Sequence, residues 1–243
     1  MSNFTTWRSL VDGEEIGAIP DSVVHQYNSQ DLDLSDNDPV STWPDEVGEA
    51  DLSENNSPTF ETDAINGEPA VLYNGSDQSH QATNDAEDWV FYTDADSMAC
   101  LAVIETFNSD QNQGVATTTD DGTGGYFAID TRRDEQLEWS VSGRDTTRGG
   151  TIPSDTGLLV EVNRISGQDT LRIDGNPVAS SSEETDSGTP DDPLVVGDRG
   201  QDVTGGDPFD GYIGEVVLME NPTESEIDQI RNDMAIRWGI SLD

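Results

Sequence analysis

The stretch from residue 208 to residue 240 constrains the fold most, because it predicts a strand and a helix in direct succession. Tyr212 to Met219 carries apolar side chains at adjacent as well as alternate positions, which is typical of a strand covered on both faces. Thr223 then predicts a helix start, since its hydroxyl can accept from the Glu226 backbone N–H while the Glu226 carboxylate reaches back. A doubly covered strand belongs inside a sheet, so we expect the helix to close a compact domain.

The helix that follows has one apolar face and a defined end. The apolar side chains recur at spacings of three and four, whereas three polar ones point the other way, toward water. Gly239 supplies the left-handed residue that ends a helix, and Ile240 can fold back on the last turn. The apolar face comprises Ile227, Ile230, Met234 and Trp238, and the polar side chains are Asp228, Asn232 and Asp233.

The rest of the chain reads as short strands separated by turns, which predicts a β-sandwich. Leu158, Val160 and Val162 alternate with Glu161 and Asn163, so the first three should face the core and the other two the outside. Asp174-Gly175-Asn176 is the strongest hairpin signal in the chain. Further strands are predicted over Val23–Tyr27, Pro69–Tyr73, Trp89–Tyr92, Met98–Thr106, Tyr126–Ile129, Leu137–Val141, Leu158–Asn163, Thr170–Ile173 and Leu194–Gly197, and loops over residues 28–48, 117–125 and 180–192.

Five pieces, in this order, resemble the concanavalin A-like lectin/glucanase superfamily in its laminin-G-like branch. They are Trp43-Pro44-Asp45 with Gly48, residues 65–71 (INGEPAV), the Thr170–Val178 hairpin, residues 194–197 (LVVG), and residues 208–215 (PFDGYIGE) leading to Trp238-Gly239-Ile240. The resemblance implies an all-β, antiparallel two-sheet jelly-roll β-sandwich with one short C-terminal helix. It places that domain at residues 21–243, after an N-terminal extension over residues 1–20 that could contact another subunit.

Charge predicts the solvent in which the protein works. The chain has 51 Asp and Glu against 10 Arg and no Lys, for a net charge of −41. Carboxylates repel one another over a Debye length of about 8 Å in physiological salt but only about 3 Å at 1 M. Disorder would be the alternative for such a composition, but sixteen aromatic residues lie inside periodic segments. We therefore expect a folded protein of a haloarchaeon, or of a virus of one, in a high-salt environment.

The same charge restricts the partners. So few cations cannot neutralise phosphates, which excludes nucleic acids and anionic membrane surfaces as ligands. No apolar stretch is long enough to insert into a membrane, and the first residues lack the apolar core of an export signal. Cys100 is the single cysteine, which rules out a disulfide within the chain and predicts a small core residue.

No catalytic pattern is visible, so we predict that the chain is not an enzyme and assign no catalytic, cofactor-binding or metal residue. Glucanases of the superfamily need two carboxylates on one strand face, as in Glu-x-Asp-x-Glu, and the sequence has no such motif. The nearest pairs, Glu135 with Glu138 and Glu215 with Glu220, have odd offsets that put their members on opposite faces. His25 and His80 stand at no triad or metal spacing and read as structural or exposed residues.

Two weaker binding signals remain. Oxygen ligands are dense at Asp31, Asp33, Asp36, Asn37 and Asp38, where Ca²⁺ could bind, although the spacing is not that of an EF-hand and acids cluster by chance in such a chain. Trp139, Tyr126, Trp89 and Tyr92 could stack on sugar rings or could pack in the core.

These observations leave three hypotheses about function. The first is a structural virion protein of a haloarchaeal tailed virus, assembled in the host cytoplasm and displayed on capsid or tail as a decoration, turret or host-attachment module. It would contact other virion proteins and copies of itself, and it could bind a host glycan; laminin-G-like modules that resemble this chain occur in such viruses. The second is a cellular carbohydrate-binding or adhesion module of a haloarchaeon, and the third is a degenerate glycoside hydrolase.

Overall fold

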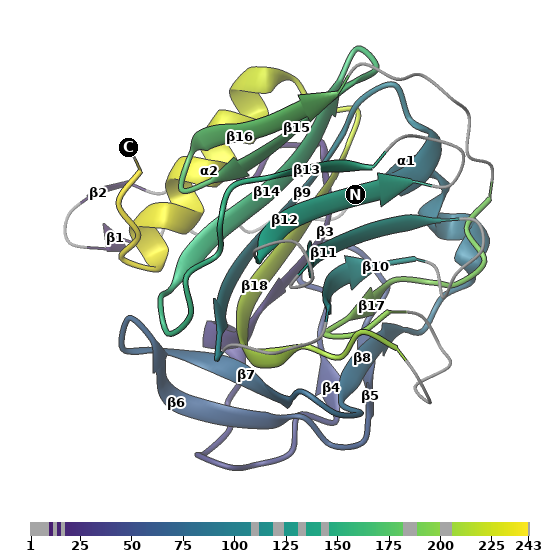
Figure 1. Cartoon of the computed structure of the whole chain (residues 1–243). Helices are drawn as coiled ribbons and strands as arrows, with labels where there is room; N and C mark the ends of the chain where they lie inside the picture. The colour runs from purple at the N-terminus through teal and green to yellow at the C-terminus, as the bar shows by residue number, and fades with distance from the viewer. Residues whose placement is uncertain are drawn as a thin grey trace, which may run out of the picture.

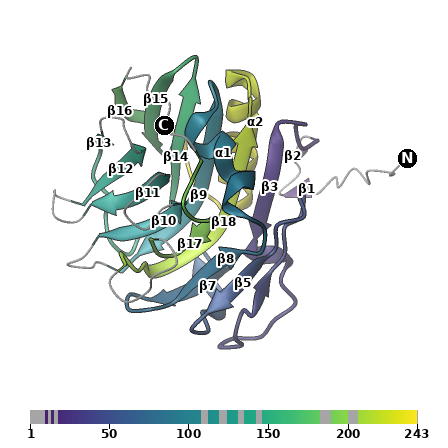
Figure 2. The same ribbon diagram turned by 90° about the vertical axis from the view of Figure 1, so that its right-hand side faces the viewer.

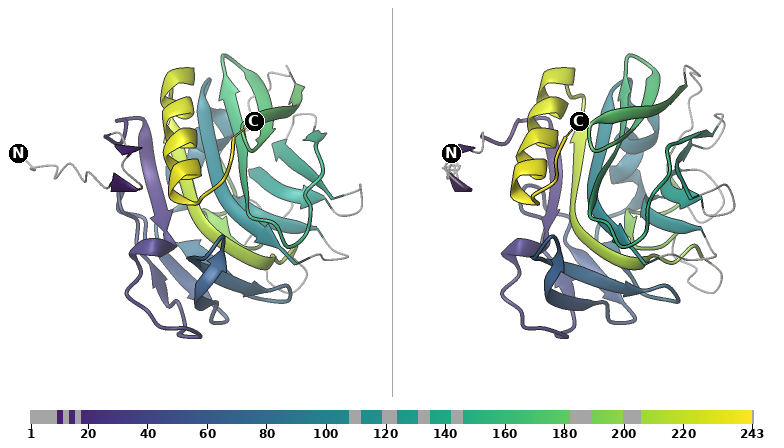
Figure 3. Two further views of the ribbon diagram at one scale, coloured as in Figure 1. Left: turned by 90° about the vertical axis from the view of Figure 1, so that its left-hand side faces the viewer. Right: turned by 60° about the vertical axis from the view of Figure 1, so that its left-hand side comes forward.

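The computed structural model describes most of the chain and shows two antiparallel β-sheets packed face to face (Figure 1). The described residues are 10–11, 14–15, 18–107, 112–118, 124–130, 135–141, 146–181, 189–199 and 206–242. Figures 2 and 3 show the sheets as stacked layers with a C-terminal helix on the outer side of one of them. The predicted all-β sandwich with a short C-terminal helix is confirmed.

The sheet without that helix, here called the front sheet, contains eight strands. Their spatial order is β13 (Thr147–Gly149), β12 (Gln136–Val141), β11 (Gly125–Asp130), β10 (Gln113–Thr117), β17 (Val195–Val196), β8 (Ser79–Ala82), β5 (Leu52–Asn55) and β4 (Thr42–Trp43). Every pairing in it is antiparallel.

The back sheet carries the C-terminal helix α2 (Glu224–Arg237). Its order is β16 (Asn176–Ser181), β15 (Gln168–Ile173), β14 (Leu158–Ile165), β9 (Met98–Thr106), β18 (Asp210–Glu220), β7 (Glu68–Asn74) and β6 (Thr59–Ile65). One further strand, β3 (Val23–Asn28), also pairs with β18. A separate small hairpin joins β1 (Leu10–Val11) to β2 (Glu14–Glu15).

Strand β18 lies in the middle of the back sheet, as its sequence predicts. One edge pairs with β9 along its length, whereas the other pairs first with β7 and then with β3. Val216 and Leu218 point into the core between the sheets, and Val217 and Met219 point toward α2. The strand is therefore apolar on both faces because each face is covered.

Helix α2 begins and ends where the sequence predicts. The Thr223 hydroxyl accepts from the Glu226 backbone N–H, and the Glu226 carboxylate accepts from the Thr223 backbone N–H at 2.7 Å, which completes the capping box. Gly239 has φ +61°, and the Ile240 N–H donates to the Ala235 carbonyl. The four apolar side chains predicted to share a face, Ile227, Ile230, Met234 and Trp238, are all buried on the back sheet.

Two buried carboxylates fix the helix to the sheet. Glu215 of β18 accepts from Arg237 and, at 2.8 Å, from the Trp238 indole N–H, and it is fully buried. Glu161 of β14 accepts from Arg231 through both of its oxygens. The predicted alternation along β14 is confirmed, since Leu158, Val160 and Val162 face the core between the sheets. Glu161 and Asn163 face the other way as predicted but are buried, because α2 packs on that side of the sheet.

Other expectations about local structure also need correction. Trp89–Tyr92 is not a strand: a 3₁₀ turn over Ala86–Trp89 runs into the short helix α1 (Val90–Asp94). The spacing of three between Trp89 and Tyr92 brings both rings into the core on one helical side. The predicted loop 117–125 begins with the last residue of β10, and residues 119–123 lie outside the described residues.

The N-terminal extension predicted over residues 1–20 is described only at 10–11, 14–15 and 18–20. The Ala18 carbonyl accepts from the Gln229 side chain of α2 at 2.7 Å. Its contact with another subunit stays a prediction. Within the described residues, none of the helices is both long and apolar enough to cross a membrane.

Candidate functional site

Of the four aromatic side chains considered as sugar contacts or as core residues, three pack in the core between the sheets and one lies on the outer face of the front sheet. Trp139, Trp89 and Tyr92 point between the sheets and belong to the main core, with Tyr92 edge-on to Trp139 at 5.1 Å. Rings buried there cannot stack on a ligand. Tyr126 of β11 points the other way, because its neighbour Phe127 faces the core.

Tyr126 forms the centre of a polar cluster on the outer face of the front sheet. Its hydroxyl donates to the Asp207 carboxylate at 2.8 Å, and the Arg199 guanidinium lies over its ring, 4.9 Å from the centroid. Arg199 and Asp207 are also paired with each other at 3.2 Å, with side chains 28 % and 17 % exposed. Three residues from distant segments thus form one partly exposed unit.

A second arginine and carboxylate continue this cluster along the sheet. Glu138 of β12 shares the outer face, and Arg148 of β13 donates to both of its oxygens, at 2.9 and 3.1 Å. Arg148 is 26 % exposed. We call Tyr126, Glu138, Arg148, Arg199 and Asp207 the front cluster.

The front cluster holds its phenol in the neutral form. Burial and then the charges of Asp207 and Glu138 raise the pKa of Tyr126 well above its usual range. The Tyr126 hydroxyl therefore remains a hydrogen-bond donor at neutral pH. Beside it, burial raises the pKa of Asp198 to about 6.

Sequence reasoning identified Tyr126 but missed its partners. Asp207 lies 81 residues further along the chain, so no local spacing links the two. One signal was available: every cation in this lysine-free chain is an arginine, and four of the ten, Arg132, Arg133, Arg144 and Arg148, lie within residues 132–148. The first three lie outside the described residues.

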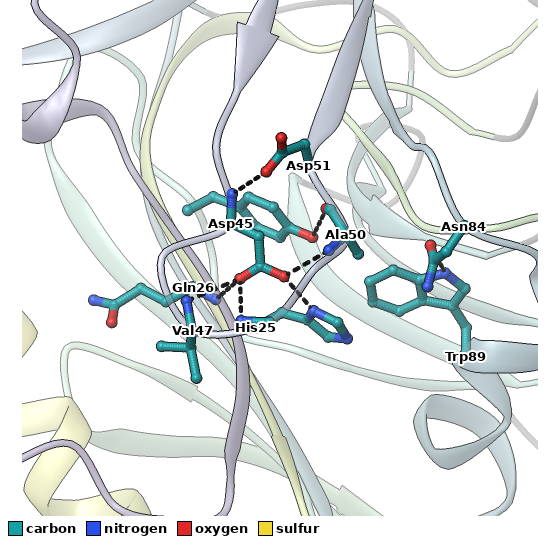
Figure 4. Close-up of polar contacts among 10 residues, drawn as sticks. His25, Gln26, Asp45, Val47, Ala50, Asp51, Asn84 and Trp89 are labelled. Carbon is teal, nitrogen blue, oxygen red and sulfur yellow. Dashed lines mark hydrogen bonds and ion pairs between the residues drawn. The ribbon is translucent and has the colours of Figure 1, made fainter. Parts of the chain in front are cut away.

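A different centre, at Asp45, organises the loop before β5 (Figure 4). One Asp45 oxygen accepts from the backbone N–H groups of Gln26, Val47 and Gly48, and the other accepts from Ala50 N–H and from His25 Nδ1. Burial would raise the pKa of Asp45, but the hydrogen bonds from His25 and the backbone lower it overall. The predicted Trp43-Pro44-Asp45 turn is thus a loop anchor.

His25 gains partners that the sequence does not reveal. Its Nδ1 lies 2.6 Å from Asp45, and its ring packs 4.5 Å from the Trp89 ring. An Asp–His pair orients an imidazole, yet no serine, threonine or cysteine in the described part of the chain is recorded within hydrogen-bond distance of His25. The pair therefore stabilises the turn.

His80 and Cys100 are core residues. The His80 ring bonds the Tyr73 hydroxyl and the Val40 carbonyl at 2.9 and 2.8 Å, and burial lowers its pKa to about 4. Cys100 is buried on β9, as predicted, and burial raises its pKa to about 12.

Three carboxylates of the acidic loop predicted as a Ca²⁺ site accept hydrogen bonds from protein groups in the loop or next to it. Asp31 accepts from the Asn28 side chain, Asp36 from Thr62, and Asp38 from the Ser35 backbone N–H. Within the described residues no group of three or more His, Cys, Asp or Glu side chains is arranged to hold a metal ion. Asp33 and Asn37 belong to the same loop, and Asn37 has φ +65°.

The two carboxylate pairs considered for catalysis do not form acid–nucleophile pairs. Glu138 pairs with Arg148 on the front sheet, whereas Glu135 precedes β12 with φ +57°. Glu215 is buried beneath α2, and Glu220 is exposed at the end of β18.

Comparison with known proteins supports the fold class. No family model matches the sequence, and no curated protein matches it. Solved structures do match, at low identity. A Trypanosoma rangeli sialidase in complex with 2,3-difluoro-KDN has a TM-score of 0.61 and 15 % identity over 93 % of this chain. The structure of domain 4 of AbnA, a GH43 extracellular arabinanase from Geobacillus stearothermophilus, in complex with arabinotriose, has a TM-score of 0.57 and 14 % identity over 86 % of this chain.

A third match is a structure of botulinum neurotoxin type C, a toxin whose cell entry depends on interaction with two ganglioside molecules. Its TM-score is 0.64, at 12 % identity over 89 % of this chain. The chain spans 34 % of the sialidase and 52 % of the neurotoxin chain, but 98 % of the arabinanase domain. The fold is therefore a β-sandwich. The solved proteins that share it include some whose structures contain a carbohydrate ligand.

The prediction that the chain is not an enzyme is contradicted by these comparisons. Several solved structures with this fold are sialidases, which are enzymes, and one is a mutant displaying trans-sialidase activity. The lack of a glucanase motif excludes one kind of catalytic centre and not catalysis in general. At identities of 14 to 15 % the likeness establishes the fold alone.

Proposed function

We propose that the protein is a carbohydrate-binding adhesion module for molar salt, and that it holds a glycan carrying a carboxylate group at the front cluster. The observation that carries the proposal is the placement of Arg148 and Arg199. In a chain with 51 acidic residues, both guanidinium groups lie on the outer face of one sheet, 26 % and 28 % exposed. Other described arginines, Arg164, Arg231 and Arg237, form mostly buried ion pairs elsewhere.

The chemistry of the front cluster fits such a ligand. Guanidinium groups bind carboxylates through paired N–H donors, and their planar geometry adds specificity. The Tyr126 ring beneath Arg199 and the Asp207 carboxylate beside it fix the direction of that guanidinium. The partly exposed Asp207 carboxylate supplies an acceptor for sugar hydroxyls. A fold found in structures solved with sialic acid, an acidic sugar, and with arabinotriose, a neutral one, supports a glycan as the ligand.

The biological setting forms part of the proposal. We place the module on the surface of a haloarchaeal tailed virus, on capsid or tail, together with other virion proteins and copies of itself. The lysine-free composition supports molar salt, and the resemblance to laminin-G-like modules of tailed viruses supports the virion. Immunoelectron microscopy of purified virions tests this placement; unlabelled particles together with labelled cells would favour the surface of a haloarchaeal cell.

Glycan binding is tested with the full chain in molar salt. A glycan array identifies ligands, and calorimetric titration then compares wild type with Arg199→Gln. Loss of a charged hydrogen bond of about 1.5–3 kcal/mol predicts a decrease in affinity of roughly 10-fold or more for the acidic glycan. Arg172→Gln is the matched control, because Arg172 is 21 % exposed but pairs with Glu161 on the back sheet. Equal affinities for both variants, or an array without any bound glycan, would refute the proposal.

A further inference from the structure

Phe107 is an exposed aromatic side chain in the described part of the chain. Among the described residues the only large hydrophobic side chains that are exposed are Phe107, at 36 %, and Ile19, at 48 %. The Phe107 backbone is held firmly, since its N–H donates to the Asp210 carbonyl at 2.9 Å. More than a third of the Phe107 side chain thus faces water from a fixed position, where its ring can contact a ligand.

A second ring makes this position a platform. Tyr212 of β18 packs against Phe107 with ring centroids 4.9 Å apart and planes at 90°. The Tyr212 side chain lies on the face of the back sheet that α2 covers. Two residues further along β18, Gly214 lies against the ring of Trp238, which follows α2. The pair therefore lies just beyond the last turn of the helix, on the opposite sheet from the front cluster.

Carboxylates surround the two rings. Glu105 of β9 is the partner of Tyr212 in the sheet register and thus shares its face. Glu61 of β6 shares that face too, because it pairs with Ala70, two residues from Leu72, which is the partner of Tyr212 on β7. Burial, then the charges of Glu61 and Glu105, raise the pKa of Tyr212. Asp155 lies beside Glu105, because its N–H donates to the Thr106 carbonyl at 2.8 Å.

We propose that the Phe107–Tyr212 platform, rimmed by Glu61, Glu105 and Asp155, binds the ring of a neutral sugar. The C–H face of a pyranose or furanose ring packs on aromatic rings, while its hydroxyl groups donate to carboxylate oxygens. The rim carboxylates disfavour an anionic sugar at contact distance, where salt screens charges least. This inference rests on the proposed function and extends it to two sites of opposite charge preference on opposite sheets.

The test uses the full chain in molar salt with arabinotriose and maltotriose as neutral probes and sialic acid as the acidic probe. Saturation-transfer NMR and calorimetric titration measure binding. Phe107→Ala should weaken binding of a neutral trisaccharide by roughly 5- to 10-fold, the effect of one lost aromatic contact. Phe107→Leu keeps the apolar bulk without the ring and should weaken it as well. Ile19→Ala, the matched control, should leave neutral-sugar affinity unchanged.

Each other outcome overturns the assignment in its own way. If both Phe107 variants bind the neutral trisaccharide with wild-type affinity, the sugar does not bind at the platform. Binding of sialic acid without binding of a neutral trisaccharide would overturn this inference and leave the front cluster standing. Absence of binding for all three probes would refute both. A dimer that Phe107→Ala dissociates in sedimentation would show that a second copy occupies the platform.

Discussion

Replacement of Glu215 by alanine tests whether the buried carboxylates hold helix α2 on the back sheet. Glu215 accepts from the Gln26 side chain at 2.7 Å, from Arg237, and from the Trp238 indole at 2.8 Å. The substitution leaves these three donors facing a small apolar side chain. Removal of one partner from a buried ion pair costs about 3–5 kcal/mol, because the other charge stays buried without compensation.

The expected change in melting temperature follows from the size of the chain. The unfolding entropy is about 2.1 cal/mol/K per residue, or roughly 0.5 kcal/mol/K for 243 residues. A loss of about 3–5 kcal/mol therefore lowers the melting temperature by about 6–10 °C. Glu220→Ala is the control: Glu220 is exposed at the end of the same strand, and its loss should change stability by less than about 0.5 kcal/mol.

Thermal and denaturant unfolding, followed by circular dichroism at two molar salt concentrations, supply the measurement. Salt screens exposed charges far more than buried ones, so the difference between Glu215→Ala and wild type should be nearly equal at both concentrations. A loss below about 1 kcal/mol, or a loss that disappears at the higher salt concentration, would show that these bonds are solvated and that packing alone holds α2.

Four further outcomes are expected. Asp45→Asn should destabilise by about 2–4 kcal/mol in denaturant titrations, because an amide cannot accept all of the N–H donors around Asp45; wild-type stability would contradict the loop anchor. Burial lowers the pKa of His80 to about 4, so its contribution to stability is complete above pH about 6.5. That contribution is lost as the pH falls from about 6.5 to about 4, by about 3 kcal/mol in total. Stability of His80→Gln should therefore depend less steeply on pH between about 6.5 and 4 than that of wild type, and parallel curves would disprove it. Gly214→Ala should lower the free energy of unfolding by about 1–3 kcal/mol, since a Cβ there would overlap the Trp238 ring. A crystal structure of the variant with the Trp238 indole in its original position would contradict this. Dialysis into dilute buffer should unfold the chain as its carboxylates repel; a native circular dichroism spectrum there would contradict the halophilic interpretation.

The elements predicted correctly carry their signals locally. The capping box at Thr223, the turn at Asp174 and Gly175 and the strand over Met98–Thr106 each depend on residues within one element. The sequence does not predict the short strands β5, β8 and β10, because four or five residues of mixed polarity become strands through their neighbours in the sheet.

The errors arise where a distant segment decides the environment. Glu161 alternates like an exposed strand residue, but Arg231 covers it from 70 residues further along the chain. Trp89 and Tyr92 have residue types common in strands, yet the core receives them on one side of a helix. The front cluster joins β11 to a segment before β18, and such a pairing exists only after folding.

The two sheets share one consequence of their strand order. β17 joins β10 to β8 in the front sheet, and β18 joins β9 to β7 and β3 in the back sheet. Both joining strands come from residues 195–220, so during synthesis most of the described chain leaves the ribosome before either sheet can be completed. Until residues 195–220 are synthesised, strand edges in both sheets remain unpaired. Repulsion between the carboxylates of neighbouring nascent chains then opposes their aggregation through these edges.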